Sequence, residues 1–223
     1  MALIQVNFMS KTLMRTVPMN VILPIDNMFY VDNPGVNNYY GEFIGKELVE
    51  ITRKMFPLSH KREDTYIAGL SMGGYGAIRN GLKYHDTFGC IAGLSSALIT
   101  DGIENRTNDV PFFIEGRSYA EGCFGDLTKV ADSDMNPKWL VNKLVKEKAD
   151  IPKIYMACGE DDFLLGANKD FKNYMEELGV EVTFEVGPGA HEWDFWNTYI
   201  KKVIEWLPLE KNGAGINSGN VGL

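Results

Sequence analysis

The chain has 223 residues, a formal net charge of −8, 45% hydrophobic residues and 23% charged residues. This length and composition are typical of one globular domain and exclude disordered and fibrous proteins. The negative charge argues against a nucleic-acid partner, because binding to a phosphate backbone needs clustered lysine and arginine. No stretch is apolar for long enough to span a bilayer, so no membrane insertion is expected.

Six apolar runs predict strands. The first two lie close together and are expected to pair antiparallel, whereas helical patterns separate most of the later ones. Strands that alternate with helices predict a mostly parallel sheet with helices on both faces, which is the α/β fold class. The predicted strands span residues 3–8, 17–23, 65–69, 90–94, 154–158 and 180–186, and the clearest helical patterns span 44–55, 171–178 and 196–203.

Two segments depart from this alternation. Residues from about 100 to 146 are rich in Asp, Asn, Gly and scattered aromatics, and they predict an insertion within the single domain. A segment that follows the carboxyl end of a strand lies above the crevice where α/β sheets bind ligands, so the insertion is expected near the active site. Residues 211–223 contain little that could pack and predict a flexible tail.

The three cysteines, Cys90, Cys123 and Cys158, are odd in number and widely spaced. They predict neither a disulfide framework nor a zinc site. The N-terminus also lacks the basic and apolar regions of a signal peptide. We therefore expect a cytoplasmic protein without a metal or a cofactor, although a chain whose signal peptide had been removed would look the same.

Residues 69–73 read Gly-Leu-Ser-Met-Gly, which is the G-x-S-x-G pattern between a predicted strand and a helix-like run. In this context the motif places a nucleophilic serine, here Ser71, on a sharp turn. Both glycines are expected to be required, because a side chain two residues from the serine would strike the neighbouring backbone. The turn also places the N–H of Met72 at the positive end of a helix, where it can bind an oxyanion.

A serine hydroxyl needs a base, and in α/β-hydrolases the base is a histidine that follows the acid along the chain. His191 lies in a glycine-rich loop between a predicted strand and a helix, and it alone follows far downstream of Ser71. His60 and His85 lie in charged, loop-like surroundings and are expected on the surface. His191 is therefore the candidate base.

The acid is expected just after the predicted strand at 154–158, where Glu160, Asp161 and Asp162 follow one another. Whichever carboxylate accepts the Nδ1 proton of His191 would hold the ring and stabilise the imidazolium. Spacing alone does not separate Asp161 from Asp162.

Residues 62–77, 158–164 and 191–196 together carry a resemblance that covers nearly the whole chain. The chain resembles the putative-esterase family of α/β-hydrolases, which includes esterase D, S-formylglutathione hydrolases, tributyrin esterases and feruloyl and acetyl-xylan esterases. The resemblance implies an α/β-hydrolase fold. In the tributyrin-esterase-like branch the acid is the aspartate directly before a phenylalanine, which selects Asp162.

One departure from this family concerns residues 24–27. In the family the strand that corresponds to residues 21–24 is followed by a strand ending in His-Gly, a helix and a further strand, roughly 40 to 60 residues in all. Here two residues separate Pro24 from Asn27. The lacking stretch supplies the second oxyanion donor, and loss of one donor typically lowers turnover about 100- to 1000-fold. We interpret the lacking stretch as residues omitted from this sequence and not as a deletion in the protein itself, because deletion of central strands would expose large apolar surfaces.

The resemblance implies a serine carboxylesterase that cleaves short-chain acyl esters through an acyl-enzyme. Carbohydrate-linked acetyl or feruloyl esters and S-formylglutathione are the alternative substrates, and a non-catalytic binding protein is the alternative of a different class. Aromatic residues of the insertion could stack on a carbohydrate or feruloyl group, or could belong to the core. The expected partner is a small-molecule ester, and homo-oligomerisation is left open. These aromatic residues are Phe112, Phe113, Tyr119 and Phe124.

Overall fold

The computed structural model describes residues 2–10, 15–23 and 28–209, with side chains from residue 28 onward. The predicted junction between Pro24 and Asn27 and the predicted tail at 211–223 lie outside the described residues. Within the described chain, no helix is both long and apolar enough to cross a membrane.

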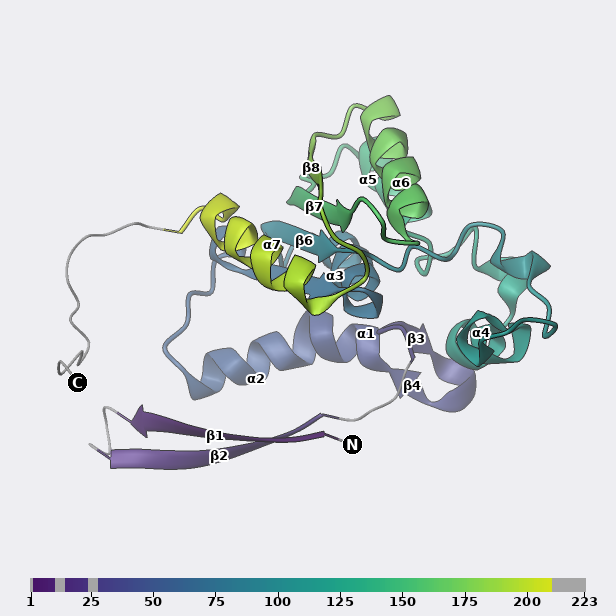
Figure 1. Ribbon diagram of the computed structural model, residues 1–223. Coiled ribbons are helices and arrows are strands. Elements are labelled where there is room, and N and C mark those ends of the chain that lie inside the picture. The colour runs from purple at the N-terminus through teal and green to yellow at the C-terminus, as the bar shows by residue number, and fades with distance from the viewer. Residues whose placement is uncertain (1, 11–14, 24–27, 210–223) are drawn as a thin grey trace.

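A four-stranded sheet forms the centre of the molecule (Figure 1). Its order is β5-β6-β7-β8, and all three pairings are parallel. The predicted α/β class with a parallel sheet is therefore confirmed. The strands are β5 (Tyr66–Leu70), β6 (Cys90–Leu94), β7 (Lys153–Gly159) and β8 (Val182–Gly187).

Helices cover both faces of this sheet (Figure 1). Successive residues of a strand face opposite sides, so Ile91 and Ile154 belong to the core beneath α3, α5 and α6, whereas Ala92 and Tyr155 pack with α7. Burial on both faces explains why β6 and most of β7 are continuous apolar runs. The helices are α3 (Met72–Lys83), α5 (Pro137–Glu147), α6 (Leu165–Glu177) and α7 (Trp193–Trp206).

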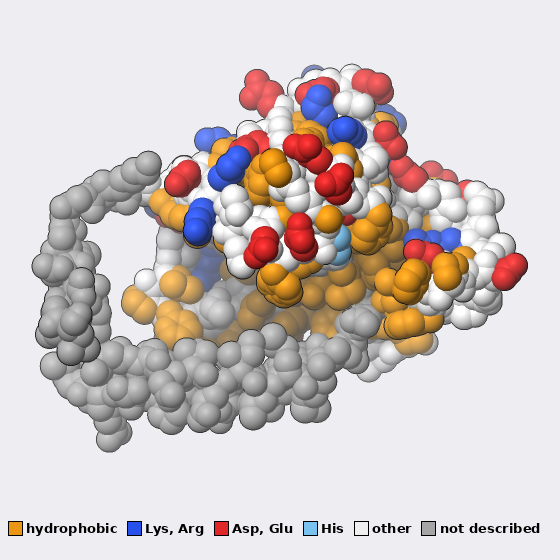
Figure 2. All heavy atoms as spheres, in the orientation of Figure 1, with side chains coloured by type: hydrophobic (Ala, Val, Ile, Leu, Met, Phe, Trp, Pro, Cys, Tyr) orange, Lys and Arg blue, Asp and Glu red, His pale blue; other side chains and the backbone are white. Residues whose placement is uncertain are grey.

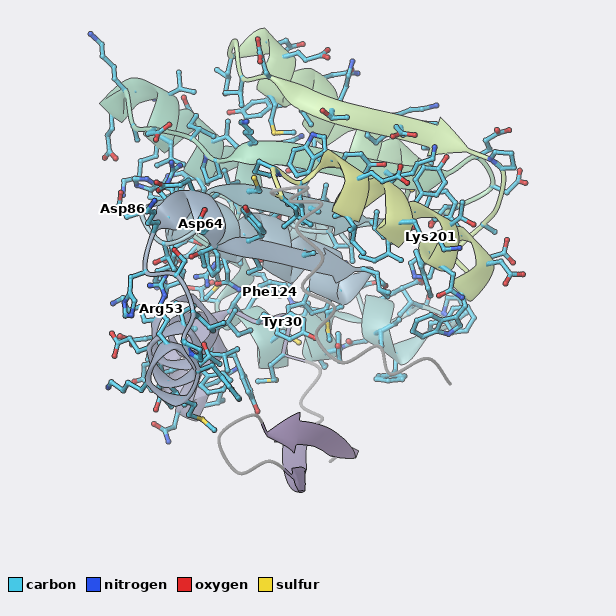
Figure 3. All side chains as sticks on the ribbon, turned by 90° about the vertical axis from the view of Figure 1, so that its left-hand side faces the viewer. Tyr30, Arg53, Asp64, Asp86, Phe124 and Lys201 are labelled. Atoms are coloured by element: carbon cyan, nitrogen blue, oxygen red, sulfur yellow. The ribbon has the colours of Figure 1, made fainter. Side chains whose placement is uncertain are left out.

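The first two predicted strands form a separate antiparallel hairpin of β1 (Ala2–Ser10) and β2 (Arg15–Leu23). Figure 3, in which Arg53 marks α2 and Lys201 marks α7, shows the hairpin well away from the four-stranded sheet. β5 lies at one edge of the sheet, so among the described strands it pairs with β6 alone. The open edge of β5 is where the lacking strands of the family are expected.

The predicted helix near residues 44–55 is present as α1 (Tyr40–Glu42), a π-helical turn (Phe43–Glu47) and α2 (Leu48–Met55). An amphipathic pattern normally marks a buried face. Here Leu48, Ile51 and Met55 are exposed. The pattern therefore predicts the helix, but the described residues leave its apolar face exposed.

Residues 100–146 contain more regular structure than their composition suggests. They include α4 (Arg117–Phe124) and most of α5, whose start is capped by the Asn136 side chain accepting from the Lys138 N–H. Asn followed by Pro is a recognisable helix start, and it was missed. The remaining short elements are β3 (Asp32–Asn33), β4 (Asn38–Tyr39) and 3₁₀ turns at Pro34–Val36, Arg62–Asp64, Ile103–Asn105, Phe113–Glu115 and Leu127–Lys129.

Candidate active site

Ser71 occupies a strained turn between β5 and α3. Its backbone has φ 54° and ψ −121°, a region that non-glycine residues enter only when the surroundings impose it. Three hydrogen bonds impose it here. The Ser71 N–H donates to the Leu94 carbonyl at 2.9 Å, and the Ser71 carbonyl accepts from the N–H groups of Tyr75 at 3.1 Å and Ala97 at 2.9 Å.

The two motif glycines differ in what their surroundings require. A Cβ on Gly69 would collide with the backbone of Gly73, as expected, whereas a Cβ on Gly73 would meet nothing within 4 Å. The expectation is therefore wrong for Gly73, because no atom lies on that side of the helix start. Gly74 is the second crowded position, since its Cβ would press on the Leu94 carbonyl and on Ser96.

The structure brings Ser71, His191 and Asp162 into one hydrogen-bonded series. The His191 Nε2 lies 2.9 Å from the Ser71 Oγ, and the His191 Nδ1 lies 3.0 Å from the Asp162 Oδ2. The Asp162 side chain is fully buried, while 22% of the His191 side chain is exposed. The second Asp162 oxygen accepts from the Leu164 N–H at 2.9 Å. This geometry suits transfer of the serine proton to an imidazole whose other nitrogen donates to a carboxylate.

Asp161 and Glu160, the other two candidate acids, are exposed. Their backbone N–H groups donate to the carbonyls of Gly189 and Gly187, at 3.1 and 2.9 Å. The loop after β7 is thereby bound to the loop that carries His191. These backbone hydrogen bonds fix the position of one loop relative to the other. Of the three candidate acids, only Asp162 directs its carboxylate at the His191 ring.

Trp196 supports the His191 ring, and sequence reasoning did not single it out for this role. Its ring lies edge-to-face on His191 with centroids 4.9 Å apart, and its Nε1–H donates to the Ser95 Oγ at 3.1 Å. Its place in the first turn of an amphipathic helix, shortly after His191, was the available signal.

Asn168 is a second residue that was missed. It is fully buried, and its side-chain amide donates to the carbonyls of Ser96 at 2.8 Å and Leu164 at 2.9 Å while it accepts from the Ser96 N–H. It therefore joins the turn after β6 to the acid loop. Nearby, burial and then the Asp162 carboxylate raise the pKa of the Cys158 thiol to about 12, so this cysteine stays protonated at neutral pH.

A groove of about 540 Å³ opens beside Ser71 along the free edge of β5, and its lining includes Met72, Tyr30 and Trp193. Met72 is the first residue of α3, and the first N–H groups of a helix have no partner within that helix. An oxyanion formed at Ser71 would lie at this positive helix end. Phe29, the neighbour of Tyr30 in the chain, packs on Phe124 of the insertion with ring centroids 5.2 Å apart; Figure 3 labels Tyr30 and Phe124.

The other sequence candidates lie elsewhere. His60 is exposed, whereas His85 is partly buried beside Asp86. In the insertion, Phe124 is buried, Tyr119 packs on Phe29 with Phe124, and Phe112 and Phe113 are exposed. Residues 100–146 do not line the groove beside Ser71. Among the described residues, no group of three or more His, Cys, Asp or Glu side chains is arranged to hold a metal ion.

Comparison with known proteins agrees with this geometry. Residues 26–206 match the family model Esterase, described as "Putative esterase". The chain belongs to this esterase family. An acetyl esterase of Caldicellulosiruptor saccharolyticus is 48% identical over 188 residues, which cover 84% of this chain and 71% of that protein. The esterase is therefore a hydrolase of carboxylic esters, as the sequence predicted.

Solved structures of similar proteins support the same fold and chemistry. The esterase is similar to the substrate-bound fluorophosphonate-binding serine hydrolase F of Staphylococcus aureus, at 27% identity and a TM-score of 0.68, with 92% of this chain and 98% of that chain covered. It is also similar to an S-formylglutathione hydrolase of Staphylococcus aureus, at 27% identity and a TM-score of 0.63 with the same coverage. The predicted α/β-hydrolase fold is confirmed.

Proposed function

We propose that Ser71 is the nucleophile, His191 the general base and Asp162 the acid of a carboxylesterase that acts on short-chain acyl esters, acetyl esters among them. The observation that carries the proposal is the unbroken series of hydrogen bonds from the Ser71 Oγ through both His191 nitrogens to Asp162. The similarity to an acetyl esterase supports the small acyl group.

The reaction follows from these positions. His191 takes the Ser71 proton as the Oγ attacks the carbonyl carbon, and the oxyanion is bound by the Met72 N–H at the start of α3. The imidazolium then gives its proton to the departing alcohol oxygen, which leaves an acyl-enzyme. A water molecule, deprotonated by His191, hydrolyses the acyl-enzyme and restores Ser71. Asp162 keeps the proton on the Nδ1 of His191 throughout.

Three finer assignments belong to the same proposal. We propose a cytoplasmic location, which three buried cysteines that form no disulfide support. A homo-oligomer stays part of the proposal, as a way to cover any apolar surface of α2 that the lacking strands leave exposed. The one-domain organisation, with residues 100–146 as an insertion near the substrate, also stays a prediction.

A substitution of Ser71 tests the catalytic assignment. The S71A variant should keep its circular dichroism spectrum and lose almost all hydrolysis of nitrophenyl acetate, because the elbow hydroxyl is the atom that forms the acyl-enzyme. A fluorophosphonate probe should label the wild-type protein at Ser71, as found by peptide mass, and should not label S71A. A folded S71A variant that retained most of its turnover, or a wild-type protein that the probe did not label, would point to a binding protein or to another nucleophile.

A further inference from the structure

The alcohol part of the ester has a defined place if the proposed function holds. His191 returns its proton to the departing oxygen, so that oxygen must lie beside the His191 Nε2. Exposed side chains near His191 therefore border the alcohol group, whereas the carbonyl oxygen of the ester lies at the Met72 N–H. Phe163 contacts His191 directly, and Trp193 is joined to it through Trp196.

Phe163 is an exposed aromatic ring held against the base. Its side chain is 77% exposed, and its ring centroid lies 4.9 Å from that of His191. Both chain neighbours, Asp162 and Leu164, are buried, and they are joined by the hydrogen bond from the Leu164 N–H to Asp162. Exposure of so much apolar surface is unfavourable in water, and the buried neighbours prevent the ring from turning inward.

Trp193 continues the aromatic surface. It is the first residue of α7, is 67% exposed and lies edge-to-face on Trp196 at 5.2 Å. Trp196 in turn lies edge-to-face on His191. Trp193 also lines the groove that contains Ser71. Four rings thus form a continuous series from Phe163 through His191 and Trp196 to Trp193.

Charge near these rings narrows the class of alcohol. Glu160 and Asp161 precede the acid, and Glu192 and Asp194 follow the base; all four residues are exposed. None of the four carboxylates forms an ion pair with a described side chain. Figure 2 shows carboxylates (red) beside hydrophobic side chains (orange) over α7. Such a surface repels an anionic leaving group.

We propose that Phe163 and Trp193 form a leaving-group subsite for an uncharged alcohol that carries a ring with an apolar face. A pyranose and an aryl ring share this chemistry, since both can stack on an aromatic side chain. Backbone hydrogen bonds of Glu160 and Asp161 join the loop that carries Phe163 to the loop before α7, whose first residue is Trp193.

The test uses acetate esters that share one acyl group and differ in the alcohol: ethyl acetate, phenyl acetate and a methyl xylopyranoside acetate. The informative quantity is kcat/KM for each ring ester divided by kcat/KM for ethyl acetate. In F163A and W193A this ratio should fall about 3- to 10-fold, which is the size of one lost aromatic contact. The loss should arise in the acylation step, in which the alcohol leaves. The rate of hydrolysis of the acetyl-enzyme, measured separately, should not account for it.

Matched controls come from F112A and F113A, because these phenylalanines are as exposed as Phe163 and belong to the insertion. Their ratios should equal that of the wild type. An equal loss for ethyl acetate and the ring esters in F163A would mean that the ring only positions His191, and would overturn the subsite. A fall confined to F112A and F113A would move the subsite to the insertion. If the ratio in F163A and W193A falls for only one of the two ring esters, that ester identifies the kind of ring that the subsite accepts.

The charge argument has its own comparison. A methyl glucoside acetate should be cleaved with a higher kcat/KM than the corresponding glucuronoside acetate, whose ring differs by a carboxylate, and E160Q/D161N should narrow the gap. Equal rates would contradict the preference for an uncharged alcohol. Failure of the subsite is distinguishable from failure of the proposed function, because fluorophosphonate labelling of Ser71 does not depend on the alcohol.

Discussion

Asp161 and Asp162 are adjacent in the chain, but their surroundings differ. The Asp162 carboxylate is buried against the Nδ1 of His191 and the Leu164 N–H, while Asp161 is exposed and engages Gly189 through its backbone. Adjacent residues after a strand tend to face opposite sides, so one of the two carboxylates reaches the ring. The different roles of the two aspartates therefore come from the direction in which each side chain points, which also decides its burial.

Replacement of each aspartate by asparagine measures that difference. D162N should lower turnover by up to about 10⁴-fold, because the amide cannot stabilise the imidazolium and favours the wrong tautomer. D161N should stay within a few-fold of wild type, since an exposed carboxylate contributes little. Steady-state kinetics on nitrophenyl acetate, with folding checked by circular dichroism, gives the ranking. The reverse ranking would make Asp161 the acid.

The two motif glycines permit a second paired comparison. G69A should prevent folding or sharply lower stability, because its Cβ would overlap the Gly73 backbone. G73A should fold and keep most of its activity, since nothing lies within 4 Å of the added methyl. Thermal unfolding and esterase rates of both variants provide the measurement. Equal damage from the two substitutions would show that the helix start needs glycine for a reason other than space.

At the scale of elements, a charged cluster joins α3 to two distant segments. The fully buried Arg79 of α3 lies 2.9 Å from Asp134, before α5, and 3.7 Å from Asp32 in β3. Lys83 contacts both aspartates, at 2.7 and 2.8 Å. Burial opposes the charge of Asp134, but Arg79 and Lys83 outweigh it and lower the pKa of that carboxyl. The cluster therefore holds the helix behind Ser71 in place.

This arrangement predicts a pH-dependent effect of D134N. A carboxyl whose folded pKa is lowered adds stability above its unfolded pKa of about 4, and that stability is lost as the pH falls through the folded pKa. D134N should therefore lower the free energy of unfolding by about 1–2 kcal/mol at pH 7. The gap from wild type should close below about pH 4. Urea unfolding across this range tests it, with the exposed Asp132→Asn as control; a gap independent of pH would contradict it.

At the scale of the whole molecule, apolar surface gathers around the open edge of β5. Grooves of about 540 and 330 Å³ run along this strand. Large apolar residues of α2 and α7 are also exposed, such as Met55 and Ile204. Parallel sheets are normally covered and extended on both sides. We expect the strand–helix–strand segment that the family has between the positions of Pro24 and Asn27 to cover this surface.

Restoration of that segment is therefore expected to improve both stability and rate. A chimera that carries the corresponding residues of the Caldicellulosiruptor acetyl esterase between Pro24 and Asn27 should melt at a higher temperature. It should also turn over about 100- to 1000-fold faster, because a second oxyanion donor is regained. A glycine–serine linker of equal length should do neither. A chimera no better than the linker variant would show that the sheet from β5 to β8 is complete as it stands.

Local pattern was sufficient for much of this protein. Alternating apolar runs and helical spacing predicted β5 to β8, α6 and α7, because burial imposes a period on the side chains of a strand or helix. Ser71 and His191 were predicted because a catalytic elbow and its base need particular residues in a particular chain order. The Asn136–Pro137 helix start was also readable, and was missed.

Other features depend on atoms that are distant in the chain, and only the folded structure revealed them. What packs beside a residue is not encoded in the hydrophobic pattern of its own segment. This applies to the space for a Cβ at Gly73, the contacts of Trp196 and Asn168, and the Arg79 cluster. The exposed face of α2 has the same origin: its pattern is that of a buried helix, and whether it is buried depends on a neighbouring surface elsewhere in the fold.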